Sequence, residues 1–286
     1  MSIAYLDGQF LPAHEARVSP FDRGFLFGDG VYEGLRAFSG RVRALDEHLQ
    51  RMRRGLLEAR IDFDTSRLAP LTNELLARNN LQDSFIYWQV TRGAPGPQDP
   101  IRERIPSRPL EPTVFGMPVP MPGLDSYREP KTCTGALVED LRWKRGHVKS
   151  VSLLGNVLGA MEARDAGAVE AIMHTDGLVS ESCASNVLVA FPDGRIATPD
   201  LESTSILDGM TRRTIIDLTP EIDVRPVQLD ELRQASEIML CGTTAMVTSV
   251  VKLDGVTIGD GTPGPVARTL LDRFVATIRS EVGAAA

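Results

Sequence analysis

The spacing of apolar residues changes several times along the chain, and each change predicts a new element. Alternating runs at 30–38 and 41–45 predict two antiparallel strands joined by a hairpin. Residues 46–61 then carry apolar side chains at every third or fourth position, which predicts an amphipathic helix. We expect a second helix over 66–80 and a strand over 84–93. The first third of the chain therefore mixes α and β elements.

Residues 93–112 are the most proline-rich part of the chain, and proline at this density disfavours both helix and strand. We expect a long loop there, of the kind that serves as a lid or a linker. A strand pattern follows, and the turn-rich segment 119–128 is the candidate domain boundary. The prediction is an N-terminal α/β domain over 1–118, an interdomain linker over 119–128 and a C-terminal domain over 129–286.

The second half contains Asp-Gly pairs between apolar runs. Those at Asp176 and Asp193 predict tight hairpin turns, because glycine adopts positive φ without strain. A helix is expected from about Asn156. Four apolar residues share one of its faces: Leu154, Val157, Leu158 and Met161. Since hairpins in both halves argue against a purely parallel sheet, the predicted fold class is α+β, with mixed and antiparallel sheets and flanking helices.

The composition is that of an ordinary globular protein. The chain has 286 residues, of which 42% are hydrophobic and 24% charged. A net charge of -7 opposes attraction to nucleic acid or to anionic membranes. No apolar run reaches the length of a membrane span, and the first residues lack the pattern of a secretory signal, so we expect a cytoplasmic location. The three cysteines form no C-x-x-C pair, which predicts free thiols and no metal site.

Lysine is rare in this chain, with 4 lysines against 27 arginines. A lysine that reacts as an amine must be uncharged for part of its cycle, which burial or a cationic neighbour promotes. Lys149 has Val148 and Val151 beside it, whereas Lys144 stands in a more polar run. Lys149 is therefore the candidate nucleophile, although a lysine at the end of a strand most often has a structural role.

Several other residues could hold pyridoxal phosphate, a cofactor that needs a lysine, an anion near its ring nitrogen and donors for its phosphate. Glu181 follows an apolar strand among small polar residues and is the candidate anion. Gly209 precedes a helix start, whose N–H groups favour phosphate. Arg51, Thr243 and Thr244 are further candidates. Each has an ordinary alternative, as an exposed acid, a helix cap or a surface side chain.

Taken together, the segments resemble the fold-type IV, or class IV, pyridoxal-phosphate-dependent aminotransferases. The motifs that carry the resemblance are "FGDGVYEGLRAF", "DEHLQRM", the lysine followed by "SVSLLGN", "VSESCASN", "ILDGMTRR" and "CGTTA". They span nearly the whole chain. The resemblance implies a two-domain enzyme that binds pyridoxal 5'-phosphate and forms a homodimer, with a loop of the neighbouring subunit closing over each site.

The resemblance also implies roles for individual residues. Lys149 would be the Schiff-base lysine and would carry the proton between the substrate α-carbon and C4′ of the cofactor, while Glu181 would keep the ring nitrogen protonated. The remaining cofactor-binding residues would be Arg51, Ser185, Asn186, Leu207, Gly209, Met210, Thr211 and Thr243. The substrate-binding residues would be Tyr32, Arg36, Gln89, Arg102, Arg104 and Thr244.

Within the family, two features are similar to the D-amino acid transaminases. They are the residues after Lys149 and the position of Gln89, where branched-chain enzymes tend to carry arginine. The expected reaction is a ping-pong transfer of an amino group between an amino acid, such as D-alanine, and 2-oxoglutarate or pyruvate. Branched-chain L-amino acid aminotransferase, (R)-amine transaminase and aminodeoxychorismate lyase activities remain alternatives, as does a scaffold without catalytic activity.

Two departures from the D-amino acid transaminases concern the substrate. The best-known members follow the strand before the proline-rich segment with an arginine and a histidine, two residues apart, that grip the substrate carboxylate. This chain has a longer loop without histidine, so Arg102, Arg104 and Arg36 are the candidates for that grip. Met246 stands where an acidic residue is common.

Overall fold

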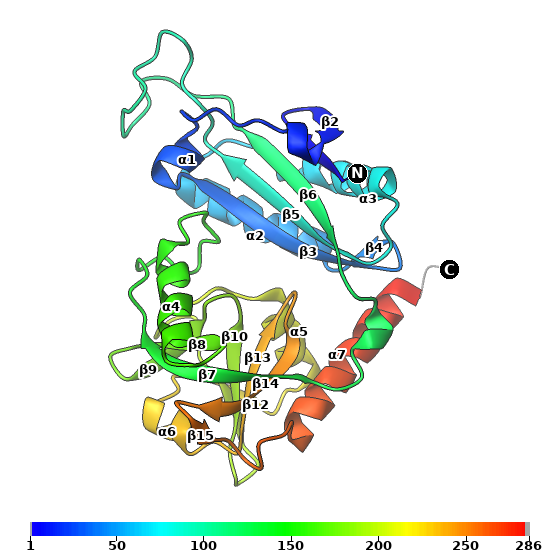
Figure 1. The fold of residues 1–286 in the computed structure, drawn as a ribbon, viewed down its shortest axis with the longest axis vertical. Coiled ribbons are helices and arrows are strands. Elements are labelled where there is room, and N and C mark those ends of the chain that lie inside the picture. The colour runs from blue at the N-terminus through cyan, green and yellow to red at the C-terminus, as the bar shows by residue number, and fades with distance from the viewer. Residues whose placement is uncertain (1, 284–286) are drawn as a thin grey trace. The chain divides into compact units, whose positions relative to one another are not determined.

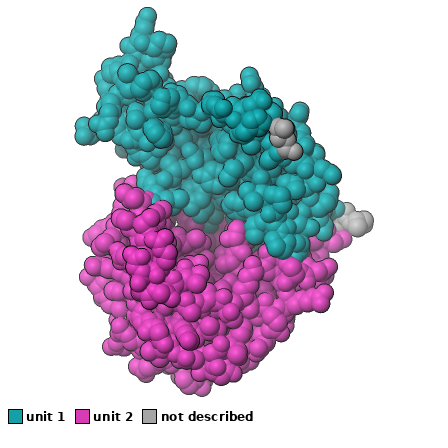
Figure 2. Space-filling model, viewed as in Figure 1, with its two compact units in different colours: residues 1–123, 148–153 teal, residues 124–147, 154–286 magenta. Residues whose placement is uncertain are grey.

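The computed structural model describes residues 2–283, which divide into two compact units. Unit 1 comprises the residues up to Gly123 together with Val148–Leu153, and unit 2 comprises the remainder (Figure 2). The chain passes from one unit to the other at Gly123, within the segment 119–128 that was expected to be a linker.

The predicted C-terminal domain, 129–286, contains one segment that does not belong to unit 2. Val148–Leu153 belongs to unit 1 because it pairs with the start of a strand there. The backbone N–H of Tyr32 donates to the carbonyl oxygen of Lys149 at 2.9 Å, and that of Val151 donates to the carbonyl of Gly30 at 3.0 Å. Lys149 is thus held by unit 1.

Within the described part of unit 1, six strands form one antiparallel sheet in the order β2-β1-β6-β5-β3-β4. The strands are β1 Ile3–Leu6, β2 Gln9–Pro12, β3 Gly30–Phe38, β4 Arg41–Val42, β5 Ser84–Thr91 and β6 Val114–Pro120. The helices are α1 Arg23–Phe27, α2 Leu45–Ala59 and α3 Leu68–Asn79, with 3-10 turns at Ala13–Glu15 and Thr65–Arg67. Helices α2 and α3 pack on one face of the sheet (Figure 1).

The alternation along β3 determines what each face of this sheet presents. Val31, Leu35 and Ala37 are buried in the core beneath α2 and α3, together with Trp88 of β5. Successive side chains on a strand point to opposite faces, so Tyr32 lies on the face away from these helices. The predicted hairpin between β3 and β4 and the predicted strand β5 are confirmed.

Within the described part of unit 2, nine strands form a mixed sheet in the order β12-β11-β10-β13-β14-β7-β8-β9, with β15 paired to β14. The strands are β7 Lys131–Glu139, β8 Glu170–Thr175, β9 Leu178–Ser182, β10 Asn186–Ala190, β11 Ile196–Thr198, β12 Ile222–Val224, β13 Glu237–Gly242, β14 Met246–Leu253 and β15 Val256–Thr257. The helices are α4 Leu154–Asp165, α5 Met210–Leu218, α6 Leu229–Arg233 and α7 Pro265–Gly283, with a 3-10 turn at Leu124–Ser126.

The helices of unit 2 flank its sheet, with α4 against β7 and β8, and with α5 and α7 against β13 (Figure 1). The pairs β11–β12, β14–β7 and β7–β8 are parallel, and the other pairs are antiparallel. The two sheets confirm the predicted α+β class with antiparallel and mixed sheets.

Helix α4 differs from an ordinary amphipathic helix. Its buried residues are the small Gly159 and Ala163, whereas its predicted apolar face is largely exposed. The exposed side chains are Leu154 at 71%, Val157 and Leu158 at 46% and Met161 at 44%. The apolar face that the sequence shows is therefore not part of the core of unit 2.

Candidate active site

In unit 1, Lys149 lies against aromatic residues of the sheet. Its Nζ donates to the hydroxyl oxygen of Tyr32 at 3.2 Å and lies 4.3 Å from the centre of the same ring. Tyr32 stacks on Tyr87, whose hydroxyl donates to Oε1 of Gln89 at 2.7 Å. Lys149 is partly buried between Val148 and a buried serine, whereas Lys144 is exposed. Three predicted residues, Lys149, Tyr32 and Gln89, thus share one face of the sheet.

Arg51 reaches the sheet from the inner face of α2 and forms a buried ion pair there. Its Nε donates to Oε1 of Glu33 at 2.7 Å and one of its terminal nitrogens donates to Oε2 at 2.8 Å. His48, one turn earlier on the helix, places Nδ1 2.9 Å from Oε2 of Glu33. A two-point contact of this kind fixes the plane of a guanidinium group.

The charges of this cluster depend on one another. Burial alone would raise the pKa of Glu33, but the positive charge of Arg51 and the hydrogen bonds from Arg51 and His48 hold that pKa far below its ordinary value of 4.5. Burial lowers the pKa of His48, an effect that the Glu33 charge opposes and that the Arg51 and Lys149 charges reinforce. Glu33 is therefore ionised, and His48 is a neutral ring whose Nδ1–H donates to it.

In unit 2, the carboxylate of Glu181 is held by several donors. Nδ2 of Asn186 donates to Oε2 at 3.0 Å, and the backbone N–H of Leu207 donates to the same oxygen at 3.2 Å. Asn186 also donates to the carbonyl of Leu207 at 2.9 Å. Glu181 is 5% exposed, so burial and these donors fix the orientation of its carboxylate. This arrangement brings together three predicted residues from two segments.

Helix α5 presents its first turn beside this carboxylate. Gly209 is its N-cap, and no side chain caps the N–H groups of the first turn. A Cβ atom at Gly209 would lie 2.0 Å from Oδ1 of Asn186, so only glycine fits this close approach. Met210 and Thr211 are buried in the first turn. Uncapped N–H groups at a nine-residue helix form a site suited to a phosphate.

Two further predicted cofactor residues, Ser185 and Thr243, lie at the ends of strands in unit 2. Ser185 precedes β10, and its hydroxyl oxygen would be 3.2 Å from a Cβ at Gly242. Thr243 follows that glycine in the turn after β13 and is partly buried. Thr244, predicted to bind substrate, is the next residue and is exposed.

The candidate arginines for a substrate carboxylate are not brought together. Arg36 is buried, donates to the carbonyl oxygen of Pro122 at 2.8 Å and lies over the ring of Phe38. Arg102 and Arg104 are exposed on the proline-rich loop.

That loop contains no helix or strand from residue 92 to residue 113, as its prolines predict. It is nevertheless anchored to unit 1, since the guanidinium of Arg23 donates to the backbone carbonyls of Glu103 and Arg104. A second nitrogen contact pairs Arg23 with Asp29 at 2.9 Å. Arg23 therefore holds the middle of the loop, at residues 103–104.

Sequence reasoning missed Glu33, His48 and Arg142. Glu33 carried a usable signal, because it stands in phase with Val31 and Leu35 on the buried face of a strand, where a charge requires a partner. Arg142 carried none, because its partner Glu181 is 39 residues away in the sequence.

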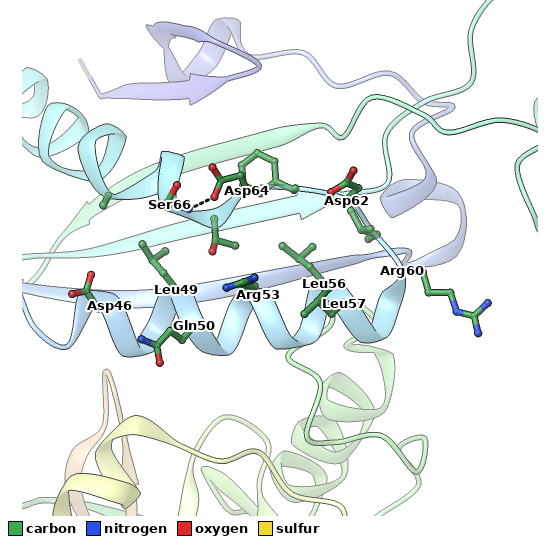
Figure 3. A pocket seen from close by; sticks show the side chains of 14 residues that line it. Asp46, Leu49, Gln50, Arg53, Leu56, Leu57, Arg60, Asp62, Asp64 and Ser66 are labelled. Atoms are coloured by element: carbon green, nitrogen blue, oxygen red, sulfur yellow. Dashed lines mark hydrogen bonds between the residues drawn. The ribbon is translucent and has the colours of Figure 1, made fainter.

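An open groove of about 890 Å³ lies along α2 and the segment 60–66. Figure 3 shows Leu49, Arg53 and Leu56 lining it from the helix. None of the residues predicted for the cofactor or substrate lines it. Among residues 2–283, no group of three or more metal-binding side chains occurs, and no helix combines the length and apolar character needed to cross a membrane.

The fold defines the class of protein as an aminotransferase. The T.th. branched-chain amino acid aminotransferase, solved with N-(5'-phosphopyridoxyl)-L-glutamate, is 26% identical and superimposes with a TM-score of 0.85, covering 99% of this chain and 94% of that chain. The branched-chain aminotransferase of Thermoproteus uzoniensis, solved with norvaline, is 25% identical with a TM-score of 0.83, covering 99% and 95%.

The family model of class IV amino-transferases matches residues 30–253, and the chain belongs to this family. Among curated relatives, the D-alanine aminotransferase of Staphylococcus haemolyticus is 37% identical, over 98% of this chain and 99% of the relative. That of Bacillus licheniformis is 36% identical, over 96% of each. The family predicted from the motifs is confirmed.

Proposed function

We propose that this aminotransferase uses pyridoxal phosphate to transfer the amino group of a D-amino acid, such as D-alanine, to a 2-oxo acid such as 2-oxoglutarate or pyruvate. The observation that carries the transfer chemistry is Lys149, a partly buried amine held 3.2 Å from the Tyr32 hydroxyl. The preference for the D-enantiomer rests on the full-length similarity to curated D-alanine aminotransferases.

The donors present in the chain suit this cofactor. A protonated ring nitrogen needs a buried anion, and Glu181 is one. A phosphate needs fixed N–H donors and a cation: the first turn of α5 has such donors, and Arg51 is the cation that the family resemblance assigns. We assign Ser185, Thr211 and Thr243 to the same phosphate-binding group because they lie at neighbouring strand and helix ends.

Pyridoxal phosphate would supply an electron sink that stabilises negative charge on the substrate α-carbon. Lys149 would hold the cofactor covalently, and its freed amine would then take the proton from the α-carbon and deliver it to C4′. The Tyr32 hydroxyl, as acceptor for Nζ, would orient the amine for both transfers. Gln89 and the Tyr87 hydroxyl would line the substrate side.

The exposed loop arginines are the proposed contacts for the substrate carboxylate. Arg102 and Arg104 each carry a guanidinium on a loop whose middle is held by Arg23. A guanidinium binds a carboxylate through two parallel hydrogen bonds. Arg36 is the weaker candidate because one of its nitrogens is used on the Pro122 carbonyl.

The enantiomer is tested by mixing the yellow, cofactor-loaded enzyme with one amino acid at a time and following the visible absorbance. D-Alanine should discharge the colour of the lysine-bound cofactor, and addition of pyruvate or 2-oxoglutarate should restore it. Bleaching by L-leucine but not by D-alanine would overturn the D-amino acid assignment.

A branched-chain L-amino acid aminotransferase is the second candidate, and the solved structures cited above favour it. Preferential bleaching by L-leucine would establish this function. The same assay tests (R)-amine transfer, in which an amine without a carboxylate would discharge the colour. A lyase acting on an aminodeoxychorismate-type substrate would release pyruvate without any amino acceptor.

The covalent anchor is tested by reducing the loaded enzyme with borohydride and digesting it. The phosphopyridoxyl mass should appear on the peptide that contains Lys149 and be absent from Lys144, the matched control in the same segment. A colourless protein that cannot be labelled at Lys149 would point to a scaffold without catalytic activity.

We also propose that the enzyme is a homodimer and that the exposed face of α4 takes part in its interface. Isolated surface leucines are ordinary, whereas Leu154, Val157, Leu158 and Met161 form a continuous apolar stripe. Leu158→Glu should shift the molecular mass from dimer to monomer in light scattering, while Arg233→Glu, at an exposed position of α6, should not. A mass unchanged by Leu158→Glu would exclude this interface.

We further propose a cytoplasmic location, which suits the three free cysteines.

A further inference from the structure

Arg142, which the family motifs do not include, lies partly buried against the proposed cofactor anion. It follows β7, and its side chain is 9% exposed. A Cβ atom at Gly155 of α4 would lie 2.8 Å from Cγ of Arg142. The lack of a side chain at Gly155 therefore leaves the space that the arginine occupies.

Arg142 links two carboxylates. One terminal nitrogen donates to Oε1 of Glu181 at 2.6 Å. The rest of the guanidinium forks onto Asp140, with Nε donating to Oδ1 at 2.9 Å and the other terminal nitrogen donating to Oδ2 at 2.7 Å. The hydroxyl of Ser180 also donates to Asp140 at 2.8 Å. Asp140 thus fixes the plane of the guanidinium, and the guanidinium fixes one oxygen of Glu181.

The contact has an electrostatic consequence for Glu181. A cation at 2.6 Å stabilises a carboxylate relative to its protonated form, and so do the donors Asn186 and Leu207 on the other oxygen. Asp140 in turn keeps Arg142 charged: burial alone would lower the pKa of Arg142, but Asp140 and Glu181 raise it above its ordinary value. These contacts therefore lower the affinity of Glu181 for a proton, so that a base beside it keeps the proton more readily.

We propose that Arg142 is a positioning residue that decides where one proton resides, and this inference rests on the proposed function of Glu181. When a ring nitrogen and a buried carboxyl group share a proton, the weaker base gives it up. By stabilising the Glu181 carboxylate, Arg142 leaves the proton on the ring nitrogen. Without Arg142, the proton moves to Glu181, and the ring withdraws electrons less strongly.

The first experiment measures the proton directly. Wild type and Arg142→Met are loaded with pyridoxal phosphate labelled with 15N in the ring, and the nitrogen resonance is recorded at neutral pH. Wild type should give the resonance of a protonated ring and Arg142→Met that of an unprotonated ring. A protonated ring in both proteins would overturn the proposal.

The second experiment compares binding of pyridoxal phosphate with binding of its 1-deaza analogue, in which carbon replaces the ring nitrogen. Arg142→Met should weaken binding of the true cofactor at least tenfold and change binding of the analogue less than twofold. Equal weakening for both would mean that Arg142 has only a structural role. Arg164→Met, which removes an exposed guanidinium from α4, is the control and should change neither affinity.

Arg142→Met leaves Asp140 partly buried without its cation, and such a variant can fail to fold. The double variant Asp140→Asn, Arg142→Gln removes both charges of that pair and keeps Glu181. Its ring resonance should match that of Arg142→Met, and a protonated ring in this protein would also overturn the proposal. If wild type is not labelled at Lys149 by borohydride, the proposed function itself fails. If wild type is labelled and the ring stays protonated in the variants, only the role of Arg142 fails.

Discussion

The buried ion pair between Glu33 and Arg51 allows a quantitative prediction. Glu33→Gln removes one charge and leaves the Arg51 guanidinium in a site where its side chain is 7% exposed. Removal of one partner from a buried ion pair costs about 3–5 kcal/mol of unfolding free energy. With a urea dependence of about 2 kcal/mol per molar, the unfolding midpoint should fall by about 1.5–2.5 M.

The assay can be confined to unit 1. Trp88 is fully buried in the core of unit 1, whereas Trp143 belongs to unit 2 and is 50% exposed. In a Trp143→Phe background, the fluorescence of Trp88 therefore reports the unfolding of unit 1 alone. Urea titrations of the cofactor-free protein, with and without Glu33→Gln, give the difference in unfolding free energy.

Two further variants make this prediction specific. Glu74→Gln removes the carboxylate of an exposed ion pair with Arg78, and it should cost only about 0.3–0.5 kcal/mol. The double variant Glu33→Leu, Arg51→Met replaces both buried charges with apolar side chains and should recover most of the lost stability. A loss below about 1 kcal/mol for Glu33→Gln, or a double variant as unstable as the single one, would refute the reasoning.

The pH dependence follows from the sign of the pKa shift. The pKa of Glu33 in the folded protein lies well below its ordinary value of 4.5, so its stabilising contribution is complete above that value. As the pH falls below about 4.5, the unfolded chain takes up the proton while the folded chain does not, and the contribution declines. The difference between wild type and Glu33→Gln should therefore be constant from pH 7 to pH 5 and should shrink below pH 4.5.

Three other predictions concern the substrate, the lysine and a thiol. Arg102→Ala or Arg104→Ala should raise the KM for amino acids at least tenfold in steady-state kinetics and leave cofactor affinity, measured by titration, within about twofold. An unchanged KM in both variants would exclude these arginines as contacts of the substrate carboxylate. Tyr32→Phe removes the acceptor for Lys149 Nζ and should slow α-proton exchange of a deuterated substrate more than it weakens cofactor binding; an unchanged exchange rate would contradict its role. Burial raises the pKa of Cys183 to about 11 from 9.0, so its thiolate fraction at pH 8 is roughly 100-fold lower than that of a free thiol. Iodoacetamide should therefore label Cys183 slowly, and rapid labelling would be inconsistent with that burial.

Local pattern was sufficient where neighbours in sequence are also neighbours in space. The alternation in 30–38, the helical spacing in 46–61 and the prolines of 93–112 each predict their own structure, because φ/ψ preferences and side-chain periodicity act over a few residues. The family motifs are local in the same sense. They were enough to propose Lys149, Glu181 and the start of α5 as parts of the site.

Tertiary structure decided the features that depend on distant segments. Val148–Leu153 joins unit 1 because it pairs with β3, more than a hundred residues earlier. Whether an apolar helix face is buried depends on what covers it, and the face of α4 remains exposed. Glu33 finds its cation on α2, and Glu181 finds Arg142 after β7, 39 residues earlier in the sequence. A charge in a sequence shows that a partner is needed once it is buried, but only the packing of strands and helices selects that partner.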